Sequence, residues 1–293
     1  MGQAVVKMAA WMAAGACMVG LAAPVQAQDT KVVLGMSGWT GFAPLTLADK
    51  AIQCAATTIE THVAWNTNGV PIVQIFQLDK SYGADGIAVR NDVKTFADLK
   101  GKTVAVDAPG TASYFTLAWL LSKNGMSVKD VKTLTLAPQP AAQSFVSGQN
   151  DAAVTYEPYL STVRANPATG KILATTLDFP HIMDTVGCAP EWLKANPKAA
   201  KALADSYFEA LEMIKADSAK SNDIMGSAVK QTGEAFAKSS NYLRWQDKAA
   251  NQKFFAGELQ QFMKDAAAIL LEAGVIRKLP ESYNAMFDDS FIK

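Results

Sequence analysis

The residues best suited to chemistry lie in the loop Pro109-Gly-Thr-Ala-Ser113, between a short predicted strand and a predicted helix. The first turn of a helix leaves backbone N–H groups unpaired, and the hydroxyls of Thr111 and Ser113 stand beside them. Such a loop can hold an anionic or polar small molecule without any catalytic residue. The first question is therefore whether this chain binds a small molecule rather than converting one.

The sequence contains few residues or motifs typical of catalysis or metal binding. It has two histidines, His62 and His181, which we expect to be ordinary, partly exposed residues, and it has no CxxC, HExxH or GxSxG motif. Gly35, Gly38 and Gly41 are spaced by three, which does not match GxGxxG and favours a tight turn. We therefore expect no enzymatic activity, no cofactor and no metal.

Strands and helices must alternate to position the loop. Apolar runs predict strands at 31–36, 70–76, 86–89, 103–106, 131–136, 152–156 and 171–175. Helical spacing of apolar residues predicts helices from Ser113 and over 141–146, 158–164, 199–215 and 247–273. This alternation is typical of an α/β fold with mostly parallel sheets, in which ligands bind at the carboxyl ends of the strands.

Polar and aromatic residues recur at those strand ends. The candidate ligand-binding residues are Ser37, Trp39, Thr40, Thr57, Thr58, Asp79, Asp85, Thr111, Ser113, Tyr156 and Glu157. Thr57 and Thr58, followed by Glu60, also resemble a helix cap, and an Asp79–Lys80 pair is more often solvated than ligating. Their repeated placement on one sheet edge is the stronger signal.

The N-terminus resembles an export signal. Lys7 precedes an apolar run over 8–23, and Val25-Gln-Ala27 has the small-x-small form of a signal peptidase site. We expect residues 1–27 to be a signal peptide that is cleaved after Ala27. The alternatives are an uncleaved anchor, which the short run disfavours, and a lipid anchor at Cys17.

Composition and cysteine content narrow the class further. Hydrophobic residues make up 49% of the chain, enough for a substantial core, and Lys plus Arg equals Asp plus Glu at 27 each. That balance gives no support for nucleic-acid binding. Cys54 and Cys188 remain after signal removal, and in an oxidising compartment they either form a disulfide or stay as two buried thiols.

Five short motifs carry a family resemblance. They are Gly38-Trp-Thr-Gly-Phe-Ala-Pro44, Ser81-Tyr-Gly-Ala-Asp-Gly86, Leu99-Lys-Gly-Lys-Thr-Val104, Pro109-Gly-Thr111 and Tyr156-Glu-Pro158. Together they resemble the periplasmic substrate-binding proteins of nitrate/sulfonate/taurine ABC importers, a group that also contains thiamine-precursor binders. The resemblance runs from about Lys31 to the C-terminal helices.

The resemblance implies a type II periplasmic-binding-protein fold with two lobes, mixed but mostly parallel sheets, and C-terminal helices. Residues 28–88 plus 187–293 would form one lobe and 89–186 the other, with crossovers near 86–91 and 184–192. The implied protein is a periplasmic monomer that binds a small solute and delivers it to an ABC permease. The alternatives are a non-transporting or decayed paralogue, and an enzyme of the same fold related to pyrimidine-precursor synthesis.

The chain departs from the family pattern between Lys50 and Ala51. About two dozen residues, the length of a strand-plus-helix unit, are missing there relative to the family. Apolar spacing predicts one long helix over 44–66, whereas the family pattern makes 52–55 a strand that leads into the cleft. The residues alone support both interpretations.

The solute class is also open at this stage. The family resemblance favours an oxyanion such as a sulfonate, taurine or nitrate, but Arg90 is the one arginine near the expected site. Trp39, Phe42, Trp65 and Tyr156 instead combine aromatic faces with nearby carboxylates. Such a set suits a nitrogen-rich or cationic solute, for example urea, guanidine or an amine.

Overall fold

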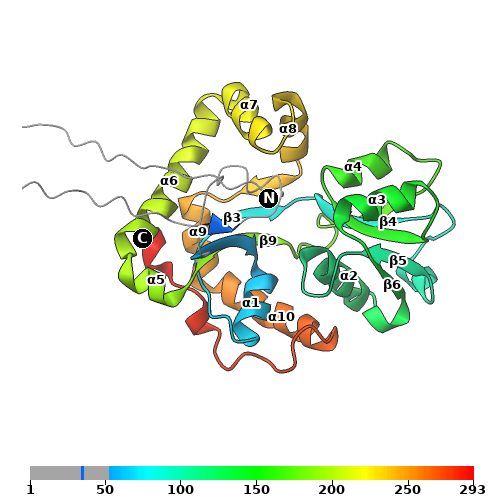
Figure 1. The fold of residues 1–293 in the computed structure, drawn as a ribbon, viewed down its shortest axis with the longest axis horizontal. Helices are drawn as coiled ribbons and strands as arrows, with labels where there is room; N and C mark the ends of the chain where they lie inside the picture. The colour runs from blue at the N-terminus through cyan, green and yellow to red at the C-terminus, as the bar shows by residue number, and fades with distance from the viewer. Residues whose placement is uncertain (1–33, 36–52) are drawn as a thin grey trace, which may run out of the picture.

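The computed structural model describes residues 34–35 and 53–293 of the chain. The predicted signal peptide, the candidates Ser37, Trp39 and Thr40, and the Lys50–Ala51 junction lie outside the described residues. The described part forms two five-stranded sheets in separate lobes (Figure 1). We call the part built on the first sheet lobe one (34–35, 53–81 and 183–293) and the part built on the second sheet lobe two (85–175).

Lobe one combines segments from both ends of the described chain. Its sheet has the order β1-β2-β9-β3-β10, with β1 Leu34–Gly35, β2 Cys54–Thr58, β9 Met183–Cys188, β3 Val73–Ser81 and β10 Leu243–Trp245. Its helices are α1 Ile59–Thr67, α5 Pro190–Ala195, α6 Pro197–Ala216, α7 Ser218–Ala228, α8 Gly233–Ser240, α9 Lys248–Lys253 and α10 Leu259–Glu272. Helix α1 packs against α10, and α6 packs against β3 through the stacked rings of Phe76 and Tyr207.

Lobe two is one continuous stretch of chain. Its sheet has the order β6-β5-β7-β4-β8, with β6 Lys132–Thr135, β5 Thr103–Val106, β7 Ala152–Tyr156, β4 Asp85–Val89 and β8 Lys171–Thr175. The remaining elements are α2 Ala112–Lys123, α3 Pro138–Val146 and α4 Tyr159–Arg164. Alternate residues of β5 face opposite sides: Val104 and Val106 join the core cluster that contains Leu117 of α2, whereas Ala105 joins the cluster that contains Phe145 of α3.

Both sheets are mixed, as the sequence predicts, but the balance of strand directions differs from the prediction. Among the described strands, three neighbouring pairs are parallel and five are antiparallel, so the expectation of mostly parallel sheets is wrong. The physical reason is that β4 and β9, the first strands after each connection between the lobes, run antiparallel to both of their neighbours.

The connections between the lobes lie earlier in the chain than expected. The chain leaves the first sheet after Ser81 and enters the second at Asp85, and it returns between Thr175 and Met183. The predicted crossovers at 86–91 and 184–192 therefore fall largely within β4 and β9, which are strands of the sheets. The sequence-based lobe limits 28–88, 89–186 and 187–293 shift accordingly by a few residues.

The segment before α1 is a strand, as the family pattern implies. Strand β2 pairs in parallel with β1 and antiparallel with β9, so the expectation of one long helix over 44–66 is wrong at Cys54–Thr58. Residues 59–66 are helical, as part of α1, and residues 44–52 lie outside the described residues. Cys54 and Cys188 lie directly opposite each other in the β2–β9 pair and form a disulfide. Backbone pairing on both sides of β2 outweighs the helical spacing of its apolar residues.

The predicted helix over 247–273 is interrupted. A π-helical turn, Phe254–Glu258, separates α9 from α10, and the backbone leaves helical geometry at Gly257. Helix α10 also contacts lobe two, because Trp119 of α2 packs beside Phe262 with ring centroids 5.9 Å apart. Phe115 and Trp119 therefore belong to the main hydrophobic core of lobe one.

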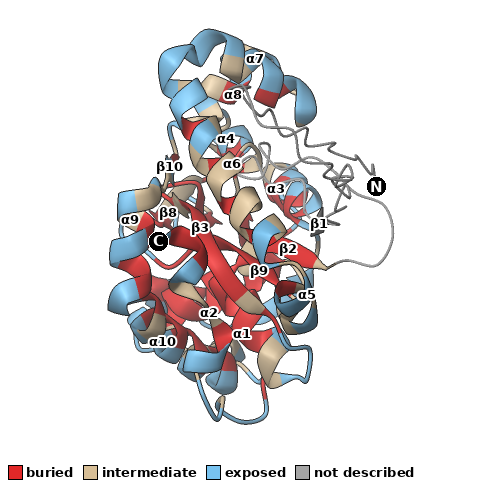
Figure 2. Ribbon diagram, turned by 90° about the vertical axis from the view of Figure 1, so that its left-hand side faces the viewer, coloured by how far each residue is buried: buried red, intermediate tan, exposed pale blue. Residues whose placement is uncertain are grey.

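Burial concentrates in the strands and in the inner helix faces (Figure 2). Helix α7 is mostly exposed and α8 is largely of intermediate burial, and the two share a small core of their own around Met225 and Phe236. None of the helices in the described part of the chain has the length and apolar character that crossing a bilayer requires.

Candidate ligand-binding site between the lobes

A cavity of about 330 Å³ lies where the two lobes face each other. Residues from both sheets and from the second connection line it: Thr57, Thr58, Thr61, Trp65, Asp85, Asp107, Gly110, Thr111, Ala112, Ser113, Tyr156, Ile182 and Asp184. Small-molecule sites commonly measure about 300–1,000 Å³, so this cavity suits a small solute. We call it the interlobe pocket.

The wall from lobe two is the loop that joins β5 to α2. Gly110 has a φ of +93°, a conformation that glycine adopts without strain, and the chain then enters α2 at its N-cap, Thr111. The Thr111 hydroxyl donates to the Ala108 carbonyl at 2.9 Å and accepts from the Tyr114 N–H at 3.4 Å. Ser113 is buried, and within the described part of the chain its Oγ has no hydrogen-bond partner. The loop thus presents an unused hydroxyl to the pocket.

The wall from lobe one comes from the end of β2 and the start of α1. Thr58 is the N-cap of α1, although its side chain makes no capping bond and instead pairs with the Thr61 hydroxyl at 2.9 Å. About one turn after Thr61, Trp65 is 36% exposed and meets the His62 ring edge-on, with centroids 5.6 Å apart. This wall therefore offers hydroxyls and one aromatic face.

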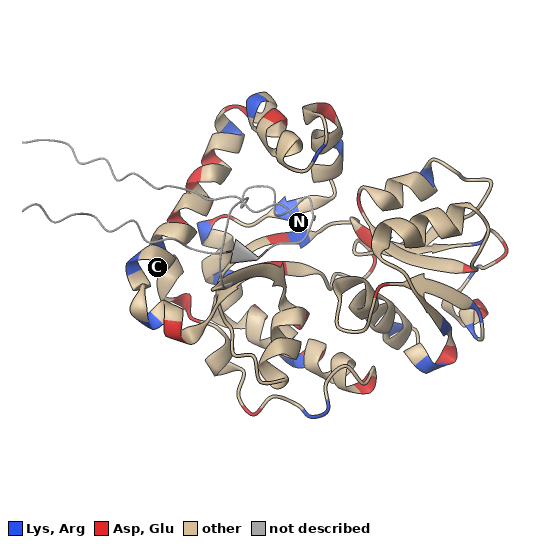
Figure 3. Ribbon diagram, in the orientation of Figure 1, with Lys and Arg blue, Asp and Glu red and all other residues tan. Residues whose placement is uncertain are grey.

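Four buried acidic residues lie at and behind the pocket. Asp85 and Asp184 line it, and Asp79 lies opposite Asp184 on the neighbouring strand, whereas Glu60 is buried in the first turn of α1. Figure 3 shows acidic segments on the edges by which the two lobes face each other. We call Glu60, Asp79, Asp85 and Asp184 the acidic cluster.

Burial shifts the proton affinity of this cluster. Loss of hydration raises the pKa of Glu60 to about 8 and that of Asp85 to about 7. Burial, followed by the charge of Asp79, also raises the pKa of Asp184 well above its usual range. A ligand that supplied positive charge or hydrogen-bond donors would favour the ionised form of these carboxyls, because it would replace the hydration that burial removes.

Six of the predicted site residues line the interlobe pocket, namely Thr57, Thr58, Asp85, Thr111, Ser113 and Tyr156. Two others do not. Asp79 is fully buried behind it, and the buried Glu157 carboxylate pairs with Arg164 and accepts from the Ser161 N–H at 3.1 Å. Glu157 thus stabilises the start of α4 rather than facing the cavity.

Sequence reasoning missed several lining residues, above all Thr61, Asp107 and Asp184. Asp107 directly follows the predicted strand 103–106, and that position at a strand's carboxyl end could have identified it. Asp184 lies at the start of the predicted crossover 184–192, so the sequence gives no sign that it belongs to a strand beside the pocket. Trp65 appeared among the aromatic candidates only through its residue type.

The histidines differ from expectation in their burial. His62 and His181 are both fully buried, and burial lowers the pKa of each to about 4. His181 packs on Trp119, and its Nε2 lies 3.0 Å from the Thr116 hydroxyl, so it fills the junction between the lobes. The described residues also contain no group of three or more histidine, cysteine, aspartate or glutamate side chains placed to hold a metal ion.

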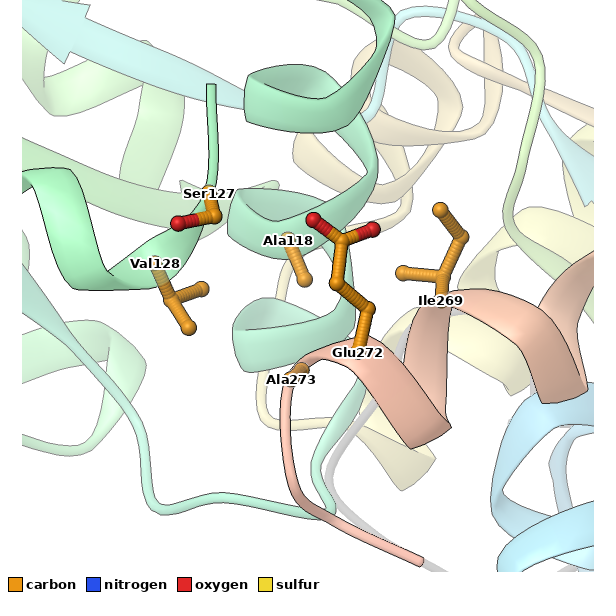
Figure 4. A pocket seen from close by; sticks show the side chains of 6 residues that line it. All are labelled: Ala118, Ser127, Val128, Ile269, Glu272 and Ala273. Carbon is orange, nitrogen blue, oxygen red and sulfur yellow. The ribbon is translucent and has the colours of Figure 1, made fainter. Parts of the chain in front are cut away.

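A second cavity lies between α2 and α10 (Figure 4). Ala118, Ser127, Val128, Ile269, Glu272 and Ala273 line it, and its volume is about 10 Å³. That space holds about one water molecule at most, so this cavity is a packing gap in the interlobe contact and not a solute site.

The two-lobed architecture and the pocket between its sheets define the class of fold. The periplasmic aliphatic sulphonate binding protein SsuA from Escherichia coli superposes with a TM-score of 0.72 at 16% identity, covering 88% of this chain and 92% of that one. The alkanesulfonate-binding protein SsuA from Xanthomonas axonopodis pv. citri, solved with bound MOPS, gives a TM-score of 0.71 at 15% identity, covering 88% and 98%. The chain therefore has the periplasmic binding protein fold. A desulfurization enzyme, DSZB, shares it with a TM-score of 0.57 at 12% identity over 82% of this chain and 83% of that one.

Sequence comparison identifies the family. Residues 36–227 match the NMT1-like family, and the chain belongs to it. Provisionally named binding proteins of Brucella abortus (strain 2308) and Brucella suis biovar 1 (strain 1330) are each 29% identical over 150 residues, which is 50% of this chain and 47% of theirs. The chain thus spans about half the length of the curated relatives it matches.

Proposed function

We propose that this protein is the solute-binding component of an ABC importer, and not an enzyme. It captures a small polar solute in the interlobe pocket and presents the closed form to a membrane permease. The observation that carries this proposal is a cavity of about 330 Å³ whose walls come from two lobes, between which the described part of the chain crosses twice. Bound solute would hold such lobes together, which is the change that a permease can recognise.

The names of structurally similar proteins support a small polar solute such as a sulfonate. Two proteins of the same fold are named for sulfonate binding. Within the pocket, threonine and serine hydroxyls stand beside carboxylates and aromatic faces, so a sulfonate, taurine or nitrate and a nitrogen-rich solute such as urea or guanidine are the two classes to compare. The protein acts as a monomer in the periplasm. It reaches that compartment by export, and its signal peptide is cleaved after Ala27. N-terminal sequencing of the exported protein should then begin at Gln28.

A thermal-shift screen tests the binding function. The panel contains taurine, ethanesulfonate, nitrate, urea, guanidinium and small amines. A solute at one hundred times its dissociation constant stabilises the folded state by about 3 kcal/mol, so at least one member should raise the melting temperature in a saturable way.

A matched pair of variants locates the effect. Thr57→Trp places a large ring in the pocket wall and should abolish the shift, whereas Thr133→Trp adds the same ring to the exposed strand β6 and should preserve it. The proposal fails if no solute in the panel stabilises the protein, or if the pocket variant responds as well as its control.

A further inference from the structure

We infer that the solute is an organic cation, an amine, amidinium or guanidinium compound, whose charged head contacts Asp85 and Asp184 in the interlobe pocket. This inference rests on the proposed binding function and deepens it by naming the solute class. It also separates this chain from structurally similar proteins that are named for sulfonate binding.

The charged residues that line the pocket are all acidic. Asp85, Asp107 and Asp184 line the pocket, and none of its described lining residues is lysine or arginine. Asp85 and Asp184 are 3% and 1% exposed, so little water remains to solvate their carboxylates. In their ionised form these carboxylates would repel a sulfonate or nitrate, whereas a cation would receive charge-assisted hydrogen bonds and would itself favour the ionised form.

Unused hydrogen-bonding atoms mark where the head group binds. In the described part of the chain, the Asp85 Oδ2 and the Ser113 Oγ have no hydrogen-bond partner, although both residues are more than nine-tenths buried and line the pocket. Buried polar atoms are normally paired, so two that face the same cavity point to a polar ligand. The ionised Asp85 oxygen only accepts and therefore needs a donor, and the Ser113 hydroxyl can accept from the same group. A guanidinium or ammonium group supplies donors and no acceptor, which fits a carboxylate oxygen and a hydroxyl together.

The arginine that could have served an oxyanion is engaged elsewhere. The Arg90 guanidinium donates to the backbone carbonyls of Asn150, Thr169 and Phe145 at 3.0, 2.9 and 2.8 Å. Arg164 pairs with Glu157 and donates to the Gly83 carbonyl. Both guanidinium groups therefore stabilise lobe two and its first connection, and neither lines the pocket.

Aromatic groups complete the site for a cation. Trp65 from lobe one and Tyr156 from lobe two both line the pocket, so each lobe contributes a ring. Aromatic faces attract ammonium and guanidinium groups, most strongly where water is excluded. A cation would thus have favourable contacts on both lobes, and its binding would favour the closed arrangement.

Three probes of similar size and different charge test the assignment. Methylguanidinium, methylurea and methanesulfonate are titrated calorimetrically into the full mature protein at pH 8, above the Asp85 pKa of about 7. Methylguanidinium should bind tightest, with methylurea at least tenfold weaker and methanesulfonate weaker still, because a charged hydrogen bond is worth about tenfold or more in affinity.

Charge-removing variants tie the preference to the pocket. Asp85→Asn and Asp184→Asn should each weaken methylguanidinium binding by about tenfold or more. Glu209→Gln removes the same charge from the exposed face of α6 and should leave the affinity unchanged. A melting curve of each variant shows whether it is folded. If one aspartate variant fails to fold, the binding affinity of the other still tests the assignment.

Two results would overturn the cation assignment. One is a methanesulfonate affinity equal to or above that of methylguanidinium, and the other is unchanged methylguanidinium affinity in both aspartate variants. Either result leaves the importer function standing, because an anionic or neutral solute still binds. Failure of every solute in the wider thermal-shift panel would instead refute the binding function itself and the cation assignment with it.

Discussion

The buried Glu60 carboxyl makes folding stability depend on pH in a calculable way. Glu60 is 1% exposed in the first turn of α1, and burial, reinforced by the charge of Asp85, raises its pKa from 4.5 to about 8. The folded state therefore keeps the proton over a range where the unfolded chain has lost it. The stabilising contribution of this group is complete below pH 4.5 and falls as the pH rises through 8.

Replacing Glu60 with glutamine removes that dependence while keeping the side chain's size. One pKa unit corresponds to about 1 kcal/mol, so the stability of Glu60→Gln relative to the unmodified protein should rise by about 1 kcal/mol for each pH unit between 5 and 8 and level off above the folded-state pKa of about 8. Between pH 5 and pH 8 the difference should grow by about 3 kcal/mol in favour of the variant.

Urea unfolding followed by circular dichroism measures both proteins across this pH range without added solute. The comparison has to be a difference, because His62 and His181 act in the opposite sense. Burial lowers the pKa of each to about 4, so the stability they contribute is present above pH 6.5 and is lost as the pH falls through 4.

Glu209→Gln, an exposed change on α6, controls for the loss of one charge. A free-energy difference between Glu60→Gln and the unmodified protein that stays constant from pH 5 to pH 8 would refute the reasoning. It would mean that Glu60 is solvated or paired in the folded state.

Two further predictions concern stability. The double variant Cys54→Ala, Cys188→Ala should lose up to about 5 kcal/mol of unfolding free energy, because the bridge spans 134 residues and restricts the unfolded chain. Thermal unfolding of the oxidised protein with and without a reductant gives the same comparison, and equal melting temperatures would contradict it. Arg164→Met should cost about 3 kcal/mol, since it leaves the buried Glu157 carboxylate without its partner. Urea unfolding of the variant measures this loss, and restored stability in Arg164→Met, Glu157→Gln would confirm that the unpaired charge is the cause.

Local pattern predicts much of lobe two. The strands over 103–106, 152–156 and 171–175 have the predicted limits, because each is a short apolar run between turn residues and pairs within a buried sheet. Ser113 and Thr111 were identified for the same reason, since a strand, a Pro-Gly turn and a helix start follow each other directly. Here the local sequence and the tertiary structure agree.

Lobe one is less predictable because its sheet joins distant segments. Strand β9, Met183–Cys188, contains aspartate, threonine and glycine and gives no strand pattern by itself. It becomes a strand through pairing with both β2 and β3. The sequence therefore does not indicate Asp184, although this residue lines the pocket, and it predicts Asp79 in the pocket, although Asp79 is buried behind it.

The Cys54–Cys188 disulfide closes the chain between these two residues into a covalent ring. Lobe two and both connections lie within the ring that this bridge closes, while the C-terminal helices lie outside it. Tension applied across residues 53 and 189 would pass through the two sulfur atoms, so lobe two would bear no load while the bridge is intact. A protease cut within lobe two would likewise leave both fragments of the protein joined. The two halves of lobe one are thus held in register by a bond that does not depend on whether lobe two is folded.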